Sequence, residues 1–209
     1  MKKRMKAYRS YRLAQTVGVF ALLVGAAIVA PSVALAATTN VPASATIVTP
    51  ITLSQPADLR FGNLSASAAL GTAVVAPPAT LPAAAPTTAA PDVSGTRSAT
   101  GGVLMVGGGA CSATVNCGPG SVQIAGGNSA SFSTITLPAT VSLTSGANTM
   151  TVGTLTSRYG ALGTAGVTTG AGTLSATGTG LLMVGGTLSV AANQVVGAYT
   201  GTMAVTIDY

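Results

Sequence analysis

Residues 199–209 read YTGTMAVTIDY and alternate between two kinds of side chain. The odd positions hold most of the larger side chains, in the order Tyr199, Gly201, Met203, Val205, Ile207 and Tyr209. The even positions hold threonine, alanine and aspartate. Because successive side chains of an extended chain point to opposite faces, this period of two predicts a half-buried β-strand, and the candidate strand spans residues 197–209.

A second alternating stretch lies at residues 43–53. Its odd positions are Ala43, Ala45, Ile47, Thr49, Ile51 and Leu53, and most of its even positions are serine or threonine. This pattern predicts another half-buried strand. Pro50 has no amide donor, which places such a strand at a sheet edge or interrupts it.

Between these two stretches the chain has short apolar runs separated by glycine. The candidate strands are residues 70–75, 102–106, 121–125, 131–137, 149–155, 172–176 and 181–190. Glycine pairs at 107–108, 126–127 and 185–186 predict turns or bulges. No stretch has a helical period, so the pattern predicts an all-β sandwich or barrel.

Residues 76–97 interrupt this pattern with a proline-rich stretch. Its prolines are Pro77, Pro78, Pro82, Pro86 and Pro91, with alanine and threonine between them. Proline fixes φ and has no amide hydrogen, so the stretch cannot form a central strand or a helix interior. We expect an extended surface loop inserted into a single domain at residues 37–209.

Residues 1–36 have the three parts of an export signal. A basic region comes first, with Lys2, Lys3, Arg4, Lys6, Arg9 and Arg12, and an uncharged apolar run follows at residues 13–30. Ala34 and Ala36 are small residues at the positions that a signal peptidase reads. We expect cleavage before Ala37, and an uncleaved membrane anchor is the alternative.

The net charge of +6 belongs to this N-terminal region, because residues 37–209 contain three arginines and three aspartates. They contain no lysine, glutamate or histidine. That composition excludes a basic nucleic-acid-binding face and any histidine-dependent nucleophile. Asp58, Asp92 and Asp208 are too widely spaced to predict a carboxylate pair. We therefore expect a protein that is not an enzyme, with no cofactor, no metal and no small-molecule substrate.

Two local features remain as candidates. Cys111 and Cys117 lie in a glycine-rich stretch of an expected exported chain, which predicts a disulfide worth about 2.4 kcal/mol in the chain-entropy model. Arg158 beside Tyr159 is either a small polar binding spot or, as we expect, an exposed pair in a loop between strands.

Several blocks of the chain occur in the order found in one family of bacterial exported domains. They are ATIVTPITL (residues 45–53), DLRFG (58–62), GTAVV (71–75), ITLP (135–138), TMTV (149–152), LMVGGTLSV (182–190), NQVVG (193–197) and YTGTMAVTIDY (199–209). On these blocks the chain resembles the family known as domain of unknown function 4402. The proline-rich stretch and the cysteine loop depart from the family pattern.

The last block also resembles the end of spore-coat-U-like and chaperone–usher pilin subunits. This resemblance implies an immunoglobulin-like antiparallel β-sandwich that is secreted to the periplasm or cell surface of a Gram-negative bacterium.

The resemblance and the alternating ends together predict a structural surface protein, a pilin-like or fibre-like subunit that assembles by terminal strand exchange. The candidate strand-exchange residues are Ile47, Ile51 and Leu53. The candidate strand for a periplasmic chaperone contains Met203, Val205, Ile207 and Tyr209. The expected partners are further copies in a homo-polymer or related surface subunits.

The alternative is a monomeric secreted binding module or adhesin for carbohydrate or a host surface. The few aromatic residues count against it, because sugar sites usually stack on aromatic rings.

Overall fold

The structure, a computed structural model, describes residues 37–86, 95–112, 114–168 and 170–209. The chain divides into two units, Met1–Ala45 and Thr46–Tyr209. In the first unit, residues 37–45 are exposed and have no secondary structure, and the expected export signal lies outside the described residues. Within the described ranges no helix is long and apolar enough to cross a membrane.

The described part of Thr46–Tyr209 consists of antiparallel β-strands without a helix, which confirms the all-β prediction. The strands are β1 (Thr52–Ala57), β2 (Arg60–Phe61), β3 (Leu64–Ala76), β4 (Thr96–Met105), β5 (Cys117–Gly118), β6 (Gly120–Ala125), β7 (Ser131–Phe132), β8 (Thr134–Thr136), β9 (Val141–Ser145), β10 (Asn148–Gly160), β11 (Gly172–Thr173), β12 (Thr179–Val190) and β13 (Thr206–Asp208).

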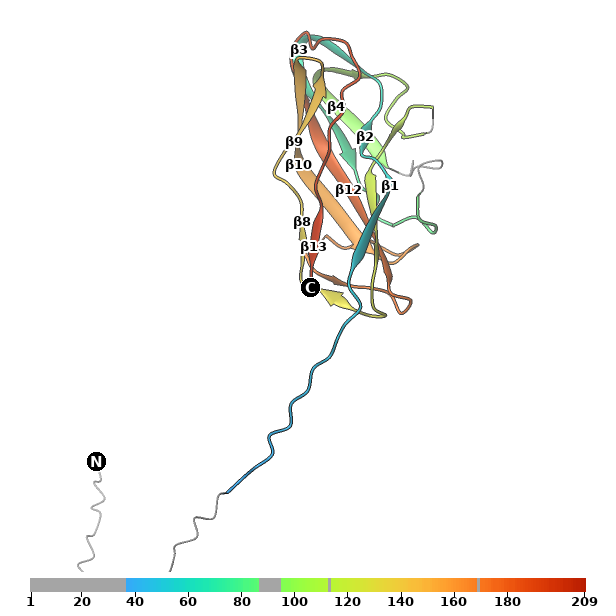
Figure 1. Cartoon of the computed structure of the whole chain (residues 1–209). Coiled ribbons are helices and arrows are strands. Elements are labelled where there is room, and N and C mark those ends of the chain that lie inside the picture. Colours follow the sequence, from blue (N-terminus) through green and yellow to red (C-terminus); the bar gives the residue numbers. More distant parts are fainter. Residues whose placement is uncertain (1–36, 87–94, 113, 169) are drawn as a thin grey trace, which may run out of the picture. The chain divides into compact units, whose positions relative to one another are not determined.

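Strand β12 is the centre of the main sheet (Figure 1). One edge of β12 pairs with β10, and β10 continues to β9. Along the other edge, residues 179–184 of β12 pair with β6, and β6 also pairs with β1. Residues 186–190 of β12 pair with β3, and β3 also pairs with β4. The remaining strands form three short pairs, β2–β5, β7–β11 and β8–β13.

The apolar run of β12 is buried on both faces of the sheet. Leu182, Val184 and Leu188 belong to the two main core clusters, which lie on one face. Leu181 and Met183 point to the opposite face, where they pack with Leu81. A strand covered on both sides needs a nearly continuous apolar sequence, as LLMVGGTLSV is.

The proline-rich stretch contributes the cover on that second face. Leu81 is only 2% exposed, and its amide donates to the carbonyl oxygen of Thr164 at 2.8 Å. The expectation of an exposed loop at residues 76–97 is therefore wrong for its first part. Its two ends also belong to β3 and β4, where Ala76 pairs with Thr96.

The glycine pair 185–186 lies inside β12 rather than in a turn. The bulge is on the neighbouring strand β10, whose register with β12 shifts between Gly153 and Thr156. Thr154 within this bulge has a φ of 45°. A Cβ at Gly186 would lie 2.8 Å from the Val152 Cγ1 atom and 2.9 Å from the Leu155 Cδ2 atom, so side chains of β10 occupy the space that a larger residue would need.

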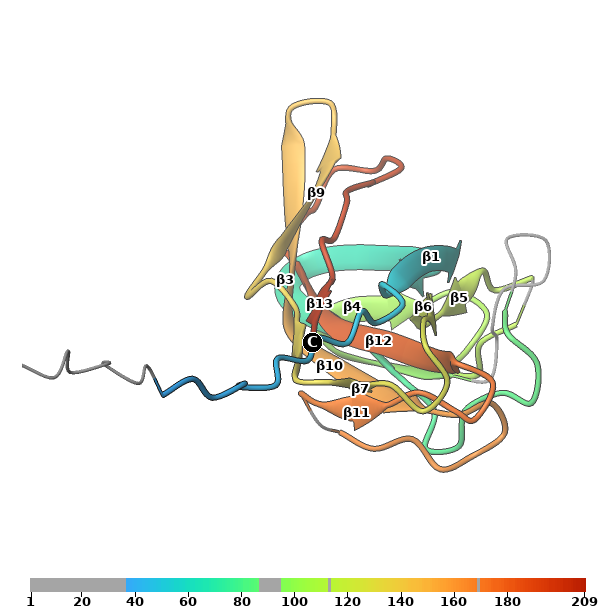
Figure 2. The same ribbon diagram turned by 60° about the horizontal axis from the view of Figure 1, so that its bottom comes forward.

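Strand β9 was not among the predicted strands. It pairs with the start of β10 in a hairpin, and the chain after β12 runs beside this hairpin (Figure 2). Its sequence VSLTS has only two large apolar residues, so the apolar pattern is too short to indicate a strand.

Candidate functional site

Residues 199–209, here called the C-terminal segment, lie over the core with the alternation that the sequence predicts. Met203, Val205 and Ile207 are half-buried and pack against the core, and Met203 contacts both main clusters. Thr202, Ala204, Thr206 and Asp208 are exposed. These residues therefore behave as those of a core-facing strand, whereas Tyr209 at the end of the same predicted face is 50% exposed.

The backbone of the same segment is paired only at its ends. Residues 206–208 form β13 and pair with β8, which lies beside it in Figure 1. Thr200 exchanges two hydrogen bonds with Thr144, at 2.8 and 3.1 Å. Between these points the backbone of residues 201–205 makes no hydrogen bond to any described residue. The single strand predicted over this segment is thus limited to Thr206–Asp208 as a hydrogen-bonded element.

A mismatch in chain length explains the gap. Thr206 pairs with Thr136 and Thr200 with Thr144, so five residues, 201–205, face seven residues, 137–143. Pro138 lies within the longer stretch and has no amide to donate. The ladder therefore cannot continue from β8 into β9, and the intervening backbone groups need water or another chain.

The N-terminal segment, residues 37–53, is not one strand. Ile47 is 99% exposed, and regular structure begins only at Thr52. Ile51 is half-buried against the core, and Leu53 pairs with Ile124 in the main sheet. The strand predicted for residues 43–53 is therefore wrong before Thr52, where Pro50 removes an amide donor and most residues are exposed.

Tyr209 connects the two segments. Its hydroxyl donates a hydrogen bond to the carbonyl oxygen of Thr49. The Ser133 hydroxyl donates to the backbone oxygen of Tyr209 at 2.6 Å, and the Ser133 amide donates to that of Asp208 at 2.8 Å. Nothing in the alternating pattern identifies Ser133 or Thr49 as partners of Tyr209, because both contacts are long-range.

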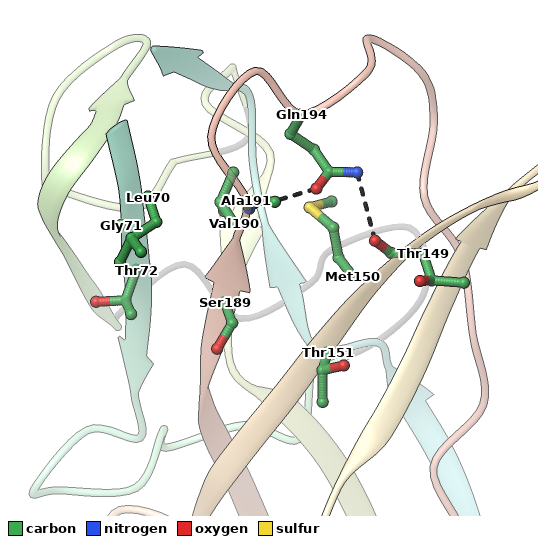
Figure 3. Close-up of a pocket in the computed structure, with 10 residues that line it drawn as sticks. All are labelled: Leu70, Gly71, Thr72, Thr149, Met150, Thr151, Ser189, Val190, Ala191 and Gln194. Atoms are coloured by element: carbon green, nitrogen blue, oxygen red, sulfur yellow. Dashed lines mark hydrogen bonds between the residues drawn. The ribbon is translucent and has the colours of Figure 1, made fainter. Parts of the chain in front are cut away.

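A hollow of about 370 Å³ lies where β12 ends between β3 and β10 (Figure 3). Met150 and Val190 contribute apolar side chains to its wall. The Gln194 amide donates to the Thr149 carbonyl at 3.3 Å and to the Tyr199 hydroxyl at 2.7 Å. None of the residues that line the hollow is ionisable, so they provide no acid or base.

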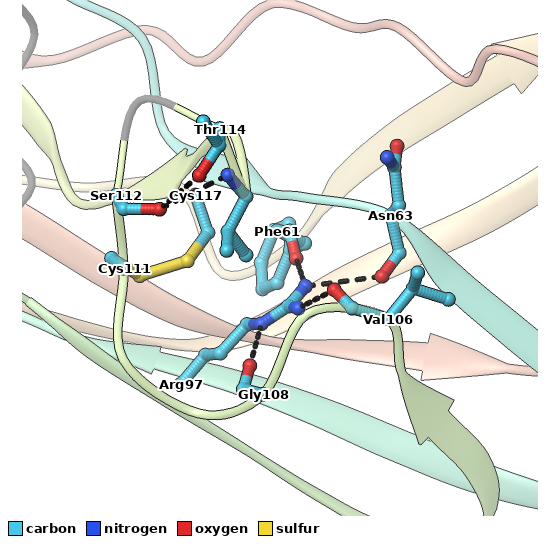
Figure 4. Close-up of a disulfide and its surroundings, with 10 residues drawn as sticks. Phe61, Asn63, Arg97, Val106, Gly108, Cys111, Ser112, Thr114 and Cys117 are labelled. Atoms are coloured by element: carbon cyan, nitrogen blue, oxygen red, sulfur yellow. Dashed lines mark hydrogen bonds between the residues drawn. A yellow bond between two sulfur atoms is a disulfide. The ribbon is translucent and has the colours of Figure 1, made fainter.

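The disulfide predicted between Cys111 and Cys117 is present, with its Cα atoms 5.0 Å apart (Figure 4). It lies beside Arg97, which is only 4% exposed. The Arg97 guanidinium donates to four backbone carbonyls, those of Phe61, Asn63, Val106 and Gly108. Desolvation lowers the pKa of Arg97. This arginine therefore joins two loops and is not directed toward a ligand.

The expectation for Arg158 and Tyr159 is wrong, because both lie in β10 and not in an exposed loop. Tyr159 is 3% exposed, its ring meets Phe132 edge-on at 4.8 Å, and its hydroxyl donates to Thr173 at 2.7 Å. Burial raises the pKa of Tyr159. The bulge in β10 changes which residues face the core, and a local sequence pattern does not reveal such a change.

The two aspartates within the described residues are not brought together as a site. Asp58 accepts a hydrogen bond from Gln55 at 2.7 Å, and Asp208 lies in β13. Asp92 lies outside the described residues. The arrangement that stands out is structural: alternate side chains of the C-terminal segment pack against the core, while the backbone of residues 201–205 makes no hydrogen bond to a described residue.

The comparisons with known proteins identify a family. A family model described as domain of unknown function (DUF4402) matches residues 83–209. No curated protein and no solved structure matches the chain. Because the family match covers more than half of its residues, the chain belongs to the DUF4402 family.

Proposed function

We propose that this protein is a structural subunit of the bacterial surface whose copies join by exchange of terminal strands. The observation that carries the proposal is the backbone of residues 201–205, which makes no hydrogen bond to a described residue although neighbouring side chains are packed in the core. Such an edge is a template for a strand from another chain.

Strand addition supplies the interactions that this edge lacks. Each new main-chain hydrogen bond contributes a net stabilisation of about 0.5–1.5 kcal/mol. An incoming strand with apolar side chains at every second position also covers the half-buried Met203, Val205 and Ile207. Several hydrogen bonds and several covered side chains together suffice for a stable junction.

The proposed architecture is an immunoglobulin-like β-sandwich. Its first layer is the main sheet, and its second is built from β8, β13 and the neighbouring extended chain. The packing of Met203 against both core clusters supports this arrangement. The resemblance of residues 199–209 to the end of spore-coat-U-like and pilin subunits also supports it.

An exported location is part of the proposal. The disulfide favours an oxidising compartment such as the periplasm or the cell surface. Residues 1–36 carry the sequence pattern of an export signal, so the proposed mature chain begins at Ala37. A non-enzymatic role accords with the lack of histidine, glutamate and lysine in residues 37–209.

A competing peptide tests the proposal. The peptide with the sequence of residues 37–48, added in excess to the mature protein, should occupy free edges and shorten the polymers several-fold in electron micrographs. The matched control is the same peptide with Ile47 replaced by aspartate, which should leave polymer length unchanged. A mature protein that is monomeric at every concentration would contradict strand exchange and support the monomeric binding module instead.

A further inference from the structure

We infer that the N-terminal segment divides at Thr49, with residues 41–47 donated to a second copy and residues from Thr49 onward retained. The second copy receives the donated residues antiparallel to its own residues 201–207. This inference rests on the proposed function and adds the boundary, the partner and the direction of the exchange.

The retained part is held by its own domain. Ile51 packs against the core, and a Cβ at Gly126 would lie only 3.4 Å from its side chain. Thr52 pairs with Ala125 and its hydroxyl donates to the Ala125 carbonyl at 3.3 Å. Removing these residues from the domain would expose the core and break the β1–β6 pairing.

The donated part has exposed apolar side chains and no secondary structure. Val41 and Ile47 are strongly exposed, and Val41, Ala43, Ala45 and Ile47 share one face of an extended chain. Residues 41–47 and residues 201–207 each span about 20 Å when extended. The two stretches therefore match in length and in the period of their apolar side chains. Pro42 is acceptable because the donated residues form an edge strand.

The bond between Tyr209 and Thr49 favours a strand that is supplied by a second copy. It holds Thr49 at the Tyr209 end of the C-terminal segment. If the preceding residues turned back onto their own domain, residues 41–47 would run in the same direction as residues 201–207. That pairing is parallel, and parallel pairing is slightly less stable per residue than antiparallel pairing. Residues 41–47 of a second copy have no such restriction and pair antiparallel.

Disulfide trapping tests the direction with three exposed threonines. Antiparallel pairing places Thr46 of one copy opposite Thr202 of the next, whereas parallel pairing places it opposite Thr206. The variants Thr46→Cys, Thr202→Cys and Thr206→Cys are mixed in pairs under assembly conditions, and the crosslinked dimers are quantified on non-reducing gels. The double variants Thr46→Cys/Thr202→Cys and Thr46→Cys/Thr206→Cys report crosslinks within one chain.

We expect the mixture of Thr46→Cys with Thr202→Cys to give at least fivefold more crosslinked dimer than the mixture with Thr206→Cys. A dominant link to position 206, within one chain or between chains, would overturn the antiparallel direction. Polymers that form without either crosslink would overturn the inference and leave strand exchange itself standing. A wild-type protein that never polymerises would overturn the proposed function and this inference with it.

Discussion

The Tyr209 hydroxyl donates a hydrogen bond to the carbonyl oxygen of Thr49, 160 residues away in the sequence. This bond holds Thr49, which follows the exposed residues 37–48, at the end of the C-terminal segment. Ile47 precedes Thr49 and is exposed, whereas Ile51 follows Thr49 and packs against the core. The two isoleucines occur in one alternating pattern but differ in burial.

Aspartate substitutions at these two positions should therefore have different effects. Ile47→Asp should leave the melting temperature unchanged, because Ile47 is exposed in its own domain. It should abolish polymers, because the charge would be placed against residues 201–207 of a neighbouring copy. Ile51→Asp should lower the melting temperature, because Ile51 packs half-buried against the core and an aspartate there places a charge beside apolar side chains. Full burial of an isoleucine contributes about 1.5–3 kcal/mol, so we expect a loss in the lower part of that range from the lost apolar contact, to which the charge adds. Circular dichroism melts and electron microscopy of both variants check this, and equal melting temperatures for the two would contradict it.

Arg97 should be a strong determinant of stability. In Arg97→Met four backbone carbonyls lose the guanidinium as a donor, and that of Asn63 keeps another donor, the Val106 amide at 3.1 Å. We expect a loss of about 3–5 kcal/mol. The matched control is Arg158→Met, which removes one hydrogen bond to Gly166 from a half-buried side chain and should cost about 1 kcal/mol. Urea unfolding measures both, and similar losses would refute the role assigned to Arg97.

Tyr159 should make the free energy of unfolding depend on pH in the alkaline range. Burial raises its pKa in the folded state, so the neutral form is favoured by folding. This stability is complete below the ordinary tyrosine pKa of about 10 and is lost as the pH rises through the folded value. Tyr159→Phe should be less stable than wild type at pH 7 and should lose less stability between pH 9 and 11.5. Urea midpoints across this range test it, and parallel curves would speak against it.

The disulfide should contribute moderately. Cys111→Ser opens a loop of seven residues and should cost about 2 kcal/mol without abolishing the fold. Thermal unfolding with and without reductant gives the comparison, and wild type under reducing conditions should match the variant. Quantitative alkylation of both thiols in the native protein would show that the disulfide does not form.

The local sequence pattern was sufficient to predict the strands whose apolar residues face the hydrophobic core. The alternation at residues 199–209 predicted that Met203, Val205 and Ile207 face the core, although Tyr209 is exposed. The run at residues 181–190 predicted most of β12. It was insufficient wherever pairing depends on distant residues. Residues 201–205 have no backbone hydrogen bond to a described residue because of the lengths of two stretches that begin at the pairings of Thr136 and Thr144. No single segment contains that information.

The same limit applies to Leu81 and Tyr159. Leu81 lies in a proline-rich stretch that reads as a surface loop, yet Leu181 and Met183 provide an apolar surface that it covers. Tyr159 follows a bulge that no local signal marks, and the bulge places it in the core. Residues 43–51 alternate as a strand does, but strand pairing begins only at Thr52. Alternation therefore indicates that a segment can form a strand, and it does not identify the strand's partner.

The mass of the mature protein in solution tests strand exchange most directly. Size-exclusion chromatography with light scattering should show polymers for residues 37–209. Deletion of residues 37–48 should give a folded monomer with an unchanged circular dichroism spectrum, because the deleted residues are exposed and form no strand. A mature protein that is monomeric at all concentrations, or polymers that persist after the deletion, would contradict the account.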